Sequence, residues 1–216
     1  MTIDIIFNQR IQTLKDLISQ GYVAHQDKIC SELSALAYDD LAIRFCIDRL
    51  ASDPFSKVMR GAQSFILMQC NEFMLRINLW FPETKLPSSV LERYDDYFSV
   101  GVCHNHNFDF FTLGILGRGY TSKFFETADV LGEKWRGDEI DFSRSWEVSL
   151  AQGVSIFVKR DSQFHVQFAP EDFSISLNLI PRQKILDDDR QFIMCRDMRT
   201  IDKVLMPISS RTEGLQ

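Results

Sequence analysis

The sequence predicts a mainly β protein with a helical N-terminal region, and three observations support this class. Apolar residues in the first 50 positions recur at helical spacing, whereas from residue 64 onward they alternate as in half-buried strands. Turn-forming residues interrupt this second part at short intervals, as between the strands of antiparallel sheets. The 216 residues are 45% hydrophobic and 25% charged, the balance of an ordinary globular protein with a sizeable core.

The charge and composition argue against several classes of protein. A net charge of −6 without a basic stripe disfavours binding to a nucleic acid. No apolar run approaches the roughly 20 residues of a membrane span, and the first residues lack the basic start and apolar core of a signal peptide. Five cysteines without close spacing predict reduced thiols, and we therefore expect a cytoplasmic protein.

The N-terminal region is expected to form helices. A first apolar run, which includes Leu14, ends at Gly21, and a second is centred on Leu33. A third run ends before Asp53-Pro54, a sequence typical of a turn. We therefore expect residues 1–62 to form a helical extension whose apolar faces pack on the β region or on a partner chain.

The region from residue 63 to residue 183 is expected to form the β domain. Cys70-Asn71-Glu72 separates two strand-like runs and predicts a hairpin, and residues 81–96 predict a loop. Within the polar stretch 129–145, Trp135, Arg136 and Asp138 are interpreted as a flap. Strands are predicted at residues 64–69, 73–80, 101–116, 120–127, 146–150, 154–159, 163–168 and 173–180. Residues 184–216 are predicted to form a C-terminal tail with a solvated acidic turn and one amphipathic segment.

Three of the four histidines lie on predicted strands. His104 and His106 stand at positions i and i+2 of one strand, so their imidazoles face the same side. His165 lies on another strand among apolar residues, whereas His25 lies in a polar helical region and is expected at the surface. Neutral imidazole is the commonest metal ligand, and three of them leave room for water or substrate at the ion. The alternative is a group of three core histidines with ordinary hydrogen bonds.

The same alternation predicts an aromatic wall beside these histidines. Phe108 and Phe110 share the face of the histidine pair, whereas Asp109 points to the opposite side. We therefore do not expect Asp109 to be a metal ligand. Cys103 also points away from the histidine face, and its expected role is packing.

His104-Asn105-His106, followed by Gly117 at a predicted hairpin turn, resembles the metal-binding motif of the cupin superfamily. Cupins are small β-barrels of two antiparallel sheets, and the glutamate usual in their motif falls at Phe110 here. Among cupins the chain is most similar to the thiol dioxygenases (cysteine dioxygenase-like proteins), which lack that carboxylate and bind iron through three histidines. The resemblance covers about half of the chain and implies a cupin-type antiparallel β-barrel (jelly roll) with a helical N-terminal extension.

The resemblance also implies catalytic residues. The Ser–His–Tyr relay of the thiol dioxygenases falls on Ser176, Asn178 and Ile180, so only its serine is matched. Ser176 and Asn178 are the catalytic candidates, and by resemblance their face of the last strand looks into the barrel. The cysteine that some relatives cross-link to the tyrosine is replaced by Phe111. Asn178 cannot exchange a proton near neutral pH as histidine can. We therefore expect slow or absent turnover of free cysteine.

Substrate-binding residues are implied by position. Thiol dioxygenases hold the substrate carboxylate with an arginine near the barrel mouth, and Arg60 and Arg76 are the candidates here. A guanidinium can bind a carboxylate through two hydrogen bonds; the alternative for each arginine is a structural ion pair. Trp80 is placed near the metal by resemblance, beside Phe108 and Phe110. Such walls exclude water from a reactive centre.

These features predict a mononuclear non-haem Fe(II) cupin oxygenase that acts on a small polar metabolite, such as an amino-acid or thiol derivative. Imidazole suits iron, zinc and nickel alike. A Zn(II) or Ni(II) isomerase or lyase without redox chemistry, and a cupin-like ligand-binding protein, therefore stay open as alternatives. The expected partners are a small-molecule substrate and O2, with neither nucleic acid nor membrane, and a homodimer is left open.

Overall fold

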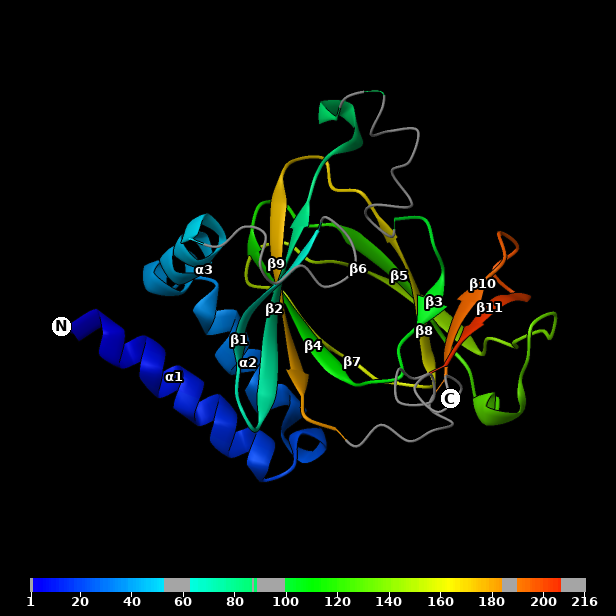
Figure 1. Cartoon of the computed structure of the whole chain (residues 1–216), viewed down its shortest axis with the longest axis horizontal. Helices are drawn as coiled ribbons and strands as arrows, with labels where there is room; N and C mark the ends of the chain where they lie inside the picture. Colours follow the sequence, from blue (N-terminus) through cyan, green and yellow to red (C-terminus); the bar gives the residue numbers. More distant parts are fainter. Residues whose placement is uncertain (1, 53–62, 87, 89–99, 184–189, 207–216) are drawn as a thin grey trace, which may run out of the picture.

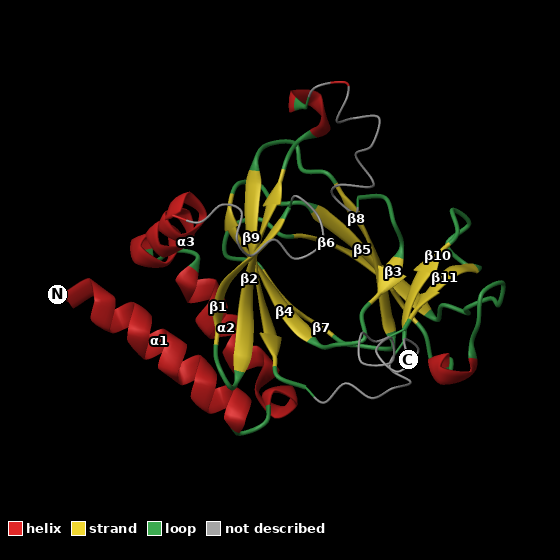
Figure 2. Cartoon of the chain, viewed as in Figure 1, coloured by secondary structure: helices red, strands yellow, loops and turns green. Residues whose placement is uncertain are grey.

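The computed structural model describes residues 2–52, 63–86, 88, 100–183 and 190–206 (Figure 1). Helices at the N-terminus are followed by strands that form two antiparallel sheets, so the predicted fold class is confirmed (Figure 2). The two sheets pack against each other through Phe110, Phe124, Val158 and Ile180. Among the helices in these ranges, none is long and apolar enough to cross a membrane.

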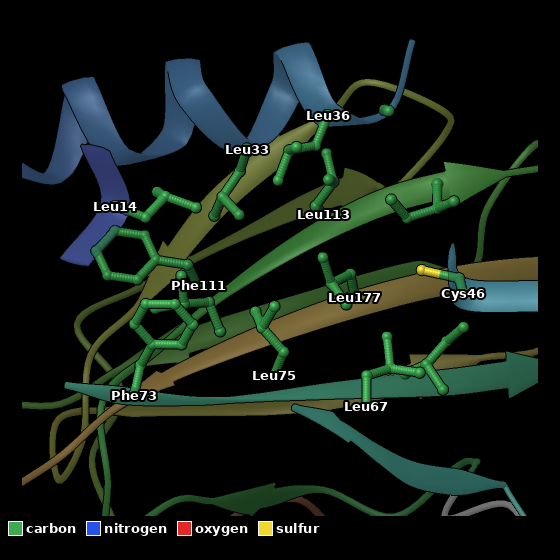
Figure 3. Close-up of a cluster of buried hydrophobic side chains, with 14 of the residues drawn as sticks. Leu14, Leu33, Leu36, Cys46, Leu67, Phe73, Leu75, Phe111, Leu113 and Leu177 are labelled. Carbon is green, nitrogen blue, oxygen red and sulfur yellow. The ribbon is translucent and has the colours of Figure 1, made fainter. Parts of the chain in front are cut away.

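The helical extension covers one face of one sheet. It consists of α1 (Thr2–Ser19), the 3-10 helix η1 (Tyr22–His25), α2 (Gln26–Leu36) and α3 (Asp40–Ser52). Gly21, which follows α1, has a φ of 109°, a conformation that favours glycine and that ends the helix where the sequence predicts. The apolar side chains of the helices pack on the nearby sheet, as Figure 3 shows for Leu14, Leu33, Leu36, Phe73, Leu75, Phe111, Leu113 and Leu177.

The two sheets, called sheet A and sheet B, draw their strands from distant parts of the chain. Sheet A has the order β1 (Ser64–Gln69), β2 (Phe73–Trp80), β9 (Ser174–Pro181), β4 (Phe110–Leu116) and β7 (Ser155–Val158). Sheet B has the order β11 (Ile201–Leu205), β10 (Gln191–Met194), β3 (His104–Asn105), β8 (Gln163–Phe168), β5 (Thr121–Glu126) and β6 (Arg144–Ser149).

The predicted strand 101–116 is wrong in one respect, because it forms two strands in different sheets. β3 belongs to sheet B and β4 to sheet A, and residues 106–109 cross from one to the other. We call these four residues the crossover. Gly117, with a φ of 82°, likewise lies in a turn that joins the two sheets rather than in a hairpin within one sheet. Alternation of apolar residues is a local signal and does not say which sheet a segment joins.

The C-terminal segment also differs from the prediction. The C-terminal residues expected to form a tail include the hairpin of β10 and β11, which extends sheet B beside β3. The polar stretch 129–145 contains the 3-10 helix η3 (Leu131–Glu133) and packs on sheet B. Leu131 and Ile140 of this stretch are buried with Phe164, Val166 and Phe192. These apolar side chains anchor the stretch on either side of Trp135. Trp135 itself is 56% exposed, and the interpretation of Trp135, Arg136 and Asp138 as a flap stays a prediction.

Candidate metal centre

The structure brings together three histidines from sheet B and the crossover. His104 of β3 lies directly opposite His165 of β8, and His106 follows two residues later in the crossover. The Nε2 atom of His165 lies 3.1 Å from Nε2 of His106 and 3.3 Å from Nε2 of His104. One ligand atom from each residue can be chosen so that all three lie within 4.8 Å of one another. The predicted triad is therefore a compact group of nitrogen donors.

The Nδ1 atoms of the three histidines differ in their hydrogen-bond contacts. Nδ1 of His104 donates to the carbonyl of Val102 at 2.9 Å, so Nε2 carries the lone pair. Nδ1 of His165 lies 3.2 Å from the Ser122 hydroxyl, an oxygen that can accept its proton in the same tautomer. Nδ1 of His106 is buried and has no hydrogen-bond partner among the residues that the structure describes. Partners of this kind orient a metal-binding imidazole, and His106 is the one without such a partner.

The three imidazoles are neutral near pH 7. Burial lowers the pKa of His104, and lowers the pKa values of His106 and His165 well below the usual range. The charge of the neighbouring imidazoles lowers the pKa of His106 and His165 further, and Arg76 acts in the same direction on His104 and His106. A neutral imidazole is the form that binds a metal ion.

The triad fits a metal ion better than an ordinary hydrogen-bonded core. Nε2 of His165 faces two other Nε2 atoms, and a single proton can satisfy only one of these contacts. Metal–nitrogen bonds of about 2.1 Å at angles of 90–110° would place two ligand nitrogens about 3.0–3.4 Å apart, which matches both observed separations. Within the described ranges the group contains no carboxylate or thiol. Three neutral nitrogens would leave coordination positions open for small molecules.

Aromatic rings surround the triad on one side. The rings of Phe108 and Phe110 lie 5.0 and 4.8 Å from the ring of His106, where the alternation of side chains predicts them. Phe124 stacks on His165 at 5.4 Å. The sequence argument missed Phe124 and Ser122, although both lie on the same face of β5. The direct pairing of Phe124 with His165 between β5 and β8 is a long-range fact that strand alternation does not supply.

Polar side chains line the inner face of sheet A. Arg76, Asn178 and Thr112 lie side by side across β2, β9 and β4. Arg76 Nε and Asn178 Oδ1 are both buried, and neither has a hydrogen-bond partner in the described part of the chain. Burial lowers the pKa of Arg76, but a guanidinium stays charged at neutral pH. The structural ion pair considered for Arg76 is not found among the described residues.

Ser176 and Trp80 contact each other next to this polar row. Trp80 Nε1 donates to Ser176 Oγ at 2.9 Å, and Asn78 Nδ2 donates to the same oxygen at 3.4 Å. The Trp80 ring stacks on Tyr120 with centroids 3.7 Å apart. The Ser176 hydroxyl is thus engaged by the protein itself, whereas the neighbouring Asn178 oxygen is not.

The remaining predicted positions are accounted for as follows. The Asp109 carboxylate accepts hydrogen bonds from the Tyr22 hydroxyl and the Arg160 backbone N–H, and it is not part of the metal-binding group. Cys103 packs in the buried cluster of sheet B, and burial raises the pKa of its thiol to about 12. Arg60 lies outside the described residues.

Comparison with known proteins gives similarities among solved structures only. No protein-family model and no curated protein matches the chain. A cupin domain from Bordetella pertussis Tohama I is 12% identical, with 58% of this chain and 99% of that chain covered and a TM-score of 0.34. Hydroquinone 1,2-dioxygenase from Sphingomonas sp. TTNP3 is 8% identical, with 59% and 70% covered and a TM-score of 0.35. The DMSP lyase DddQ from Ruegeria pomeroyi DSS-3 is 8% identical, with 56% and 46% covered and a TM-score of 0.30.

Proposed function

We propose that this protein is a metal-dependent enzyme of the cupin superfamily, in which His104, His106 and His165 hold one metal ion. We further propose Fe(II)-dependent oxygenation of a small polar metabolite as its activity. The observation that carries the proposal is the convergence of three neutral histidine nitrogens at 3.1 and 3.3 Å. Bound Fe(II) would supply O2 activation and a binding position for the substrate.

The surroundings of the triad support redox chemistry over metal-assisted hydrolysis. Phe108, Phe110 and Phe124 contact the histidine rings. No acidic side chain belongs to the three-histidine group in the part of the chain that the structure describes. Hydrolysis at a zinc ion commonly uses a nearby carboxylate as general base. Aromatic walls instead exclude water, which suits a centre that handles reactive oxygen.

The polar row on sheet A, formed by Arg76, Asn178 and Thr112, supports an amino or hydroxy acid as the substrate. The unpaired Arg76 Nε requires an acceptor, and a carboxylate matches the geometry of a guanidinium. The unpaired Asn178 oxygen, directly across from Arg76, requires a donor such as an amine or hydroxyl. An amino or hydroxy acid presents both groups on one end. The phenylalanines would contact an apolar remainder, so we propose a substrate bulkier than free cysteine, with O2 as co-substrate.

Metal analysis together with oxygen uptake tests this function. The protein, purified without chelator and loaded anaerobically with Fe(II), should hold about one iron per chain. It should consume O2 with some members of a panel of amino and hydroxy acids and thiols, but slowly or not at all with free cysteine. His165→Gln should bind iron at least about 10-fold more weakly, because a ligand is lost. His25→Gln, which alters the histidine outside the triad, is the matched control and should retain the metal.

The other outcomes discriminate between the alternatives. Stoichiometric zinc or nickel without oxygen uptake by the iron-loaded protein would favour an isomerase or lyase. A tightly bound small molecule without any metal would indicate a ligand-binding protein. Full iron retention by His165→Gln would contradict the metal centre itself.

A further inference from the structure

We infer that Asp109 is a positioning residue that couples the N-terminal extension to the metal centre by fixing the crossover that carries His106. The inference rests on the proposed function, because it requires the triad to bind a metal ion. It assigns a role at the site to a carboxylate that points away from the histidines and to Tyr22, which precedes Asp109 by 87 residues.

His106 depends on its backbone for its orientation more than the other two ligands do. Its Nδ1 has no hydrogen-bond partner in the described ranges, whereas His104 and His165 contact Val102 and Ser122. The backbone carbonyl of His106 accepts a hydrogen bond from Asp161 N at 3.2 Å. His106 also lies outside the regular pairing of either sheet. Whatever holds the crossover therefore sets the direction of this ligand.

Asp109 ties the crossover to three other segments. Its Oδ1 accepts from Arg160 N and its Oδ2 from the Tyr22 hydroxyl, both at 2.7 Å. Its backbone N–H donates to Gln183 Oε1 at 2.9 Å, and its carbonyl accepts from Gln183 Nε2 at 2.8 Å. The residue is only 6% exposed, so these bonds are shielded from water. The β7–β8 turn thus holds the crossover at both ends, at His106 through Asp161 and at Asp109 through Arg160.

The Tyr22 bond makes the helical extension part of this arrangement. Tyr22 lies in η1 between α1 and α2, and its ring packs on Phe157 of β7 with centroids 6.3 Å apart. Burial and the Asp109 carboxylate both raise the pKa of Tyr22, so the phenol remains a hydrogen-bond donor. Loss of the carboxylate would remove the acceptor of two partly buried donors, the Tyr22 hydroxyl and the Arg160 N–H, at the cost of two hydrogen bonds. The crossover would then shift to satisfy them.

Cobalt(II) binding by the full chain tests the coupling, because the absorption of bound cobalt reports its ligands without any turnover. Asp109→Ala should bind Co(II) about 10- to 100-fold more weakly, the range for loss of an outer-sphere contact, with an altered spectrum. Asp109→Asn should largely keep the wild-type cobalt affinity and spectrum, since its amide can accept from Arg160 N and donate to the Tyr22 oxygen. Tyr22→Phe should weaken Co(II) binding by less than Asp109→Ala does. If Asp109→Ala does not fold, Tyr22→Phe tests the coupling in its place.

Gln152→Ala is the matched control. Gln152 Nε2 donates to Ala37 O at 2.7 Å, so this variant removes another bond between the extension and the barrel, away from the crossover. It should lower the melting temperature but leave cobalt affinity and spectrum unchanged. Wild-type affinity and spectrum in both Asp109→Ala and Tyr22→Phe would overturn the coupling while the metal centre stands. Failure of the wild type to bind cobalt would overturn the metal centre, and the coupling with it.

Discussion

The two faces of sheet A differ in polarity: the outer face is apolar, whereas part of the inner face is polar. On the outer face, Leu75, Leu177 and Phe111 are buried beneath the helices of the extension (Figure 3). On the inner face, one residue along the same strands, Arg76, Asn178 and Thr112 form a polar row opposite sheet B. The protein therefore has an apolar core between sheet A and the helices, and polar groups in part of the space between the two sheets.

The outer face of sheet A contributes to stability, whereas the polar row on its inner face is proposed to bind a ligand. A large apolar side chain buried on the outer face contributes about 1.5–3 kcal/mol. A buried polar group without a partner instead costs about 1–3 kcal/mol, and among the described residues of the inner-face row there are three such groups, on Arg76, Asn178 and Thr112. A ligand that pairs with them would remove that cost. The apolar packing beneath the helical extension thus offsets the cost of the polar row between the sheets.

The largest expected effect comes from a pair of neighbouring substitutions on β9. Leu177→Ala should lower the free energy of unfolding by about 2–5 kcal/mol, because it leaves a cavity under the helices. Asn178→Ala should change it by less than about 1 kcal/mol, because it removes an unpaired polar group. Urea denaturation of the metal-free proteins at neutral pH measures both values. Equal losses from the two substitutions would mean that the inner face also serves as a core.

An effect of comparable size is expected from pH in the metal-free protein, because it sums over three histidines. The three site histidines have lowered pKa values in the folded state, so below about pH 6.5 the unfolded chain binds more protons. The free energy of unfolding should therefore fall as the pH falls from 6.5 to 5, by up to about 1.4 kcal/mol per pH unit for each histidine. Urea denaturation with a chelator at several pH values checks this. His165→Gln should reduce the slope, and a flat wild-type profile would contradict the burial argument.

The smallest effect on stability is expected from Arg76→Met. Replacing a guanidinium whose buried Nε has no partner among the described residues by an apolar side chain of similar length should leave the free energy of unfolding unchanged or raise it by about 1 kcal/mol. Binding of carboxylate substrates should nevertheless weaken at least about 10-fold. Arg118→Met, which removes an exposed pair with Glu171, is a control expected to change neither quantity by much. A marked loss of stability in Arg76→Met would instead assign the arginine a structural role.

The apolar and polar faces of β9 in sheet A, the helical extension and the histidine triad could largely be predicted from the sequence. Alternation along residues 173–180 separates Leu177 and Leu179 from Ser176 and Asn178, and the structure places the two leucines in the cluster beneath the helices. Helical spacing around Leu14 and Leu33 predicts the apolar faces of the extension. The rarity of histidine, together with strand parity, predicts the three residues that converge.

The remainder depends on contacts between distant residues, which local patterns do not encode. The break at the crossover lies in a segment whose alternation continues unchanged from His104 to Phe110. The strands of the C-terminal hairpin are only four and five residues long, too short for a clear periodic signal. The bond between Tyr22 and Asp109 joins residues 87 positions apart, so neither residue's local sequence indicates it.

The pairing of β3 with β8 implies that the protein must fold before it can bind a metal ion at this site. His104 and His165 are 61 residues apart and become neighbours only when these short strands pair, so the unfolded chain has no preformed site. A metal ion would bind the native state and, by mass action, protect it: at 100 times the dissociation constant it would add about 2.7 kcal/mol to stability. The abundance of the folded protein in a cell would then follow the supply of its metal.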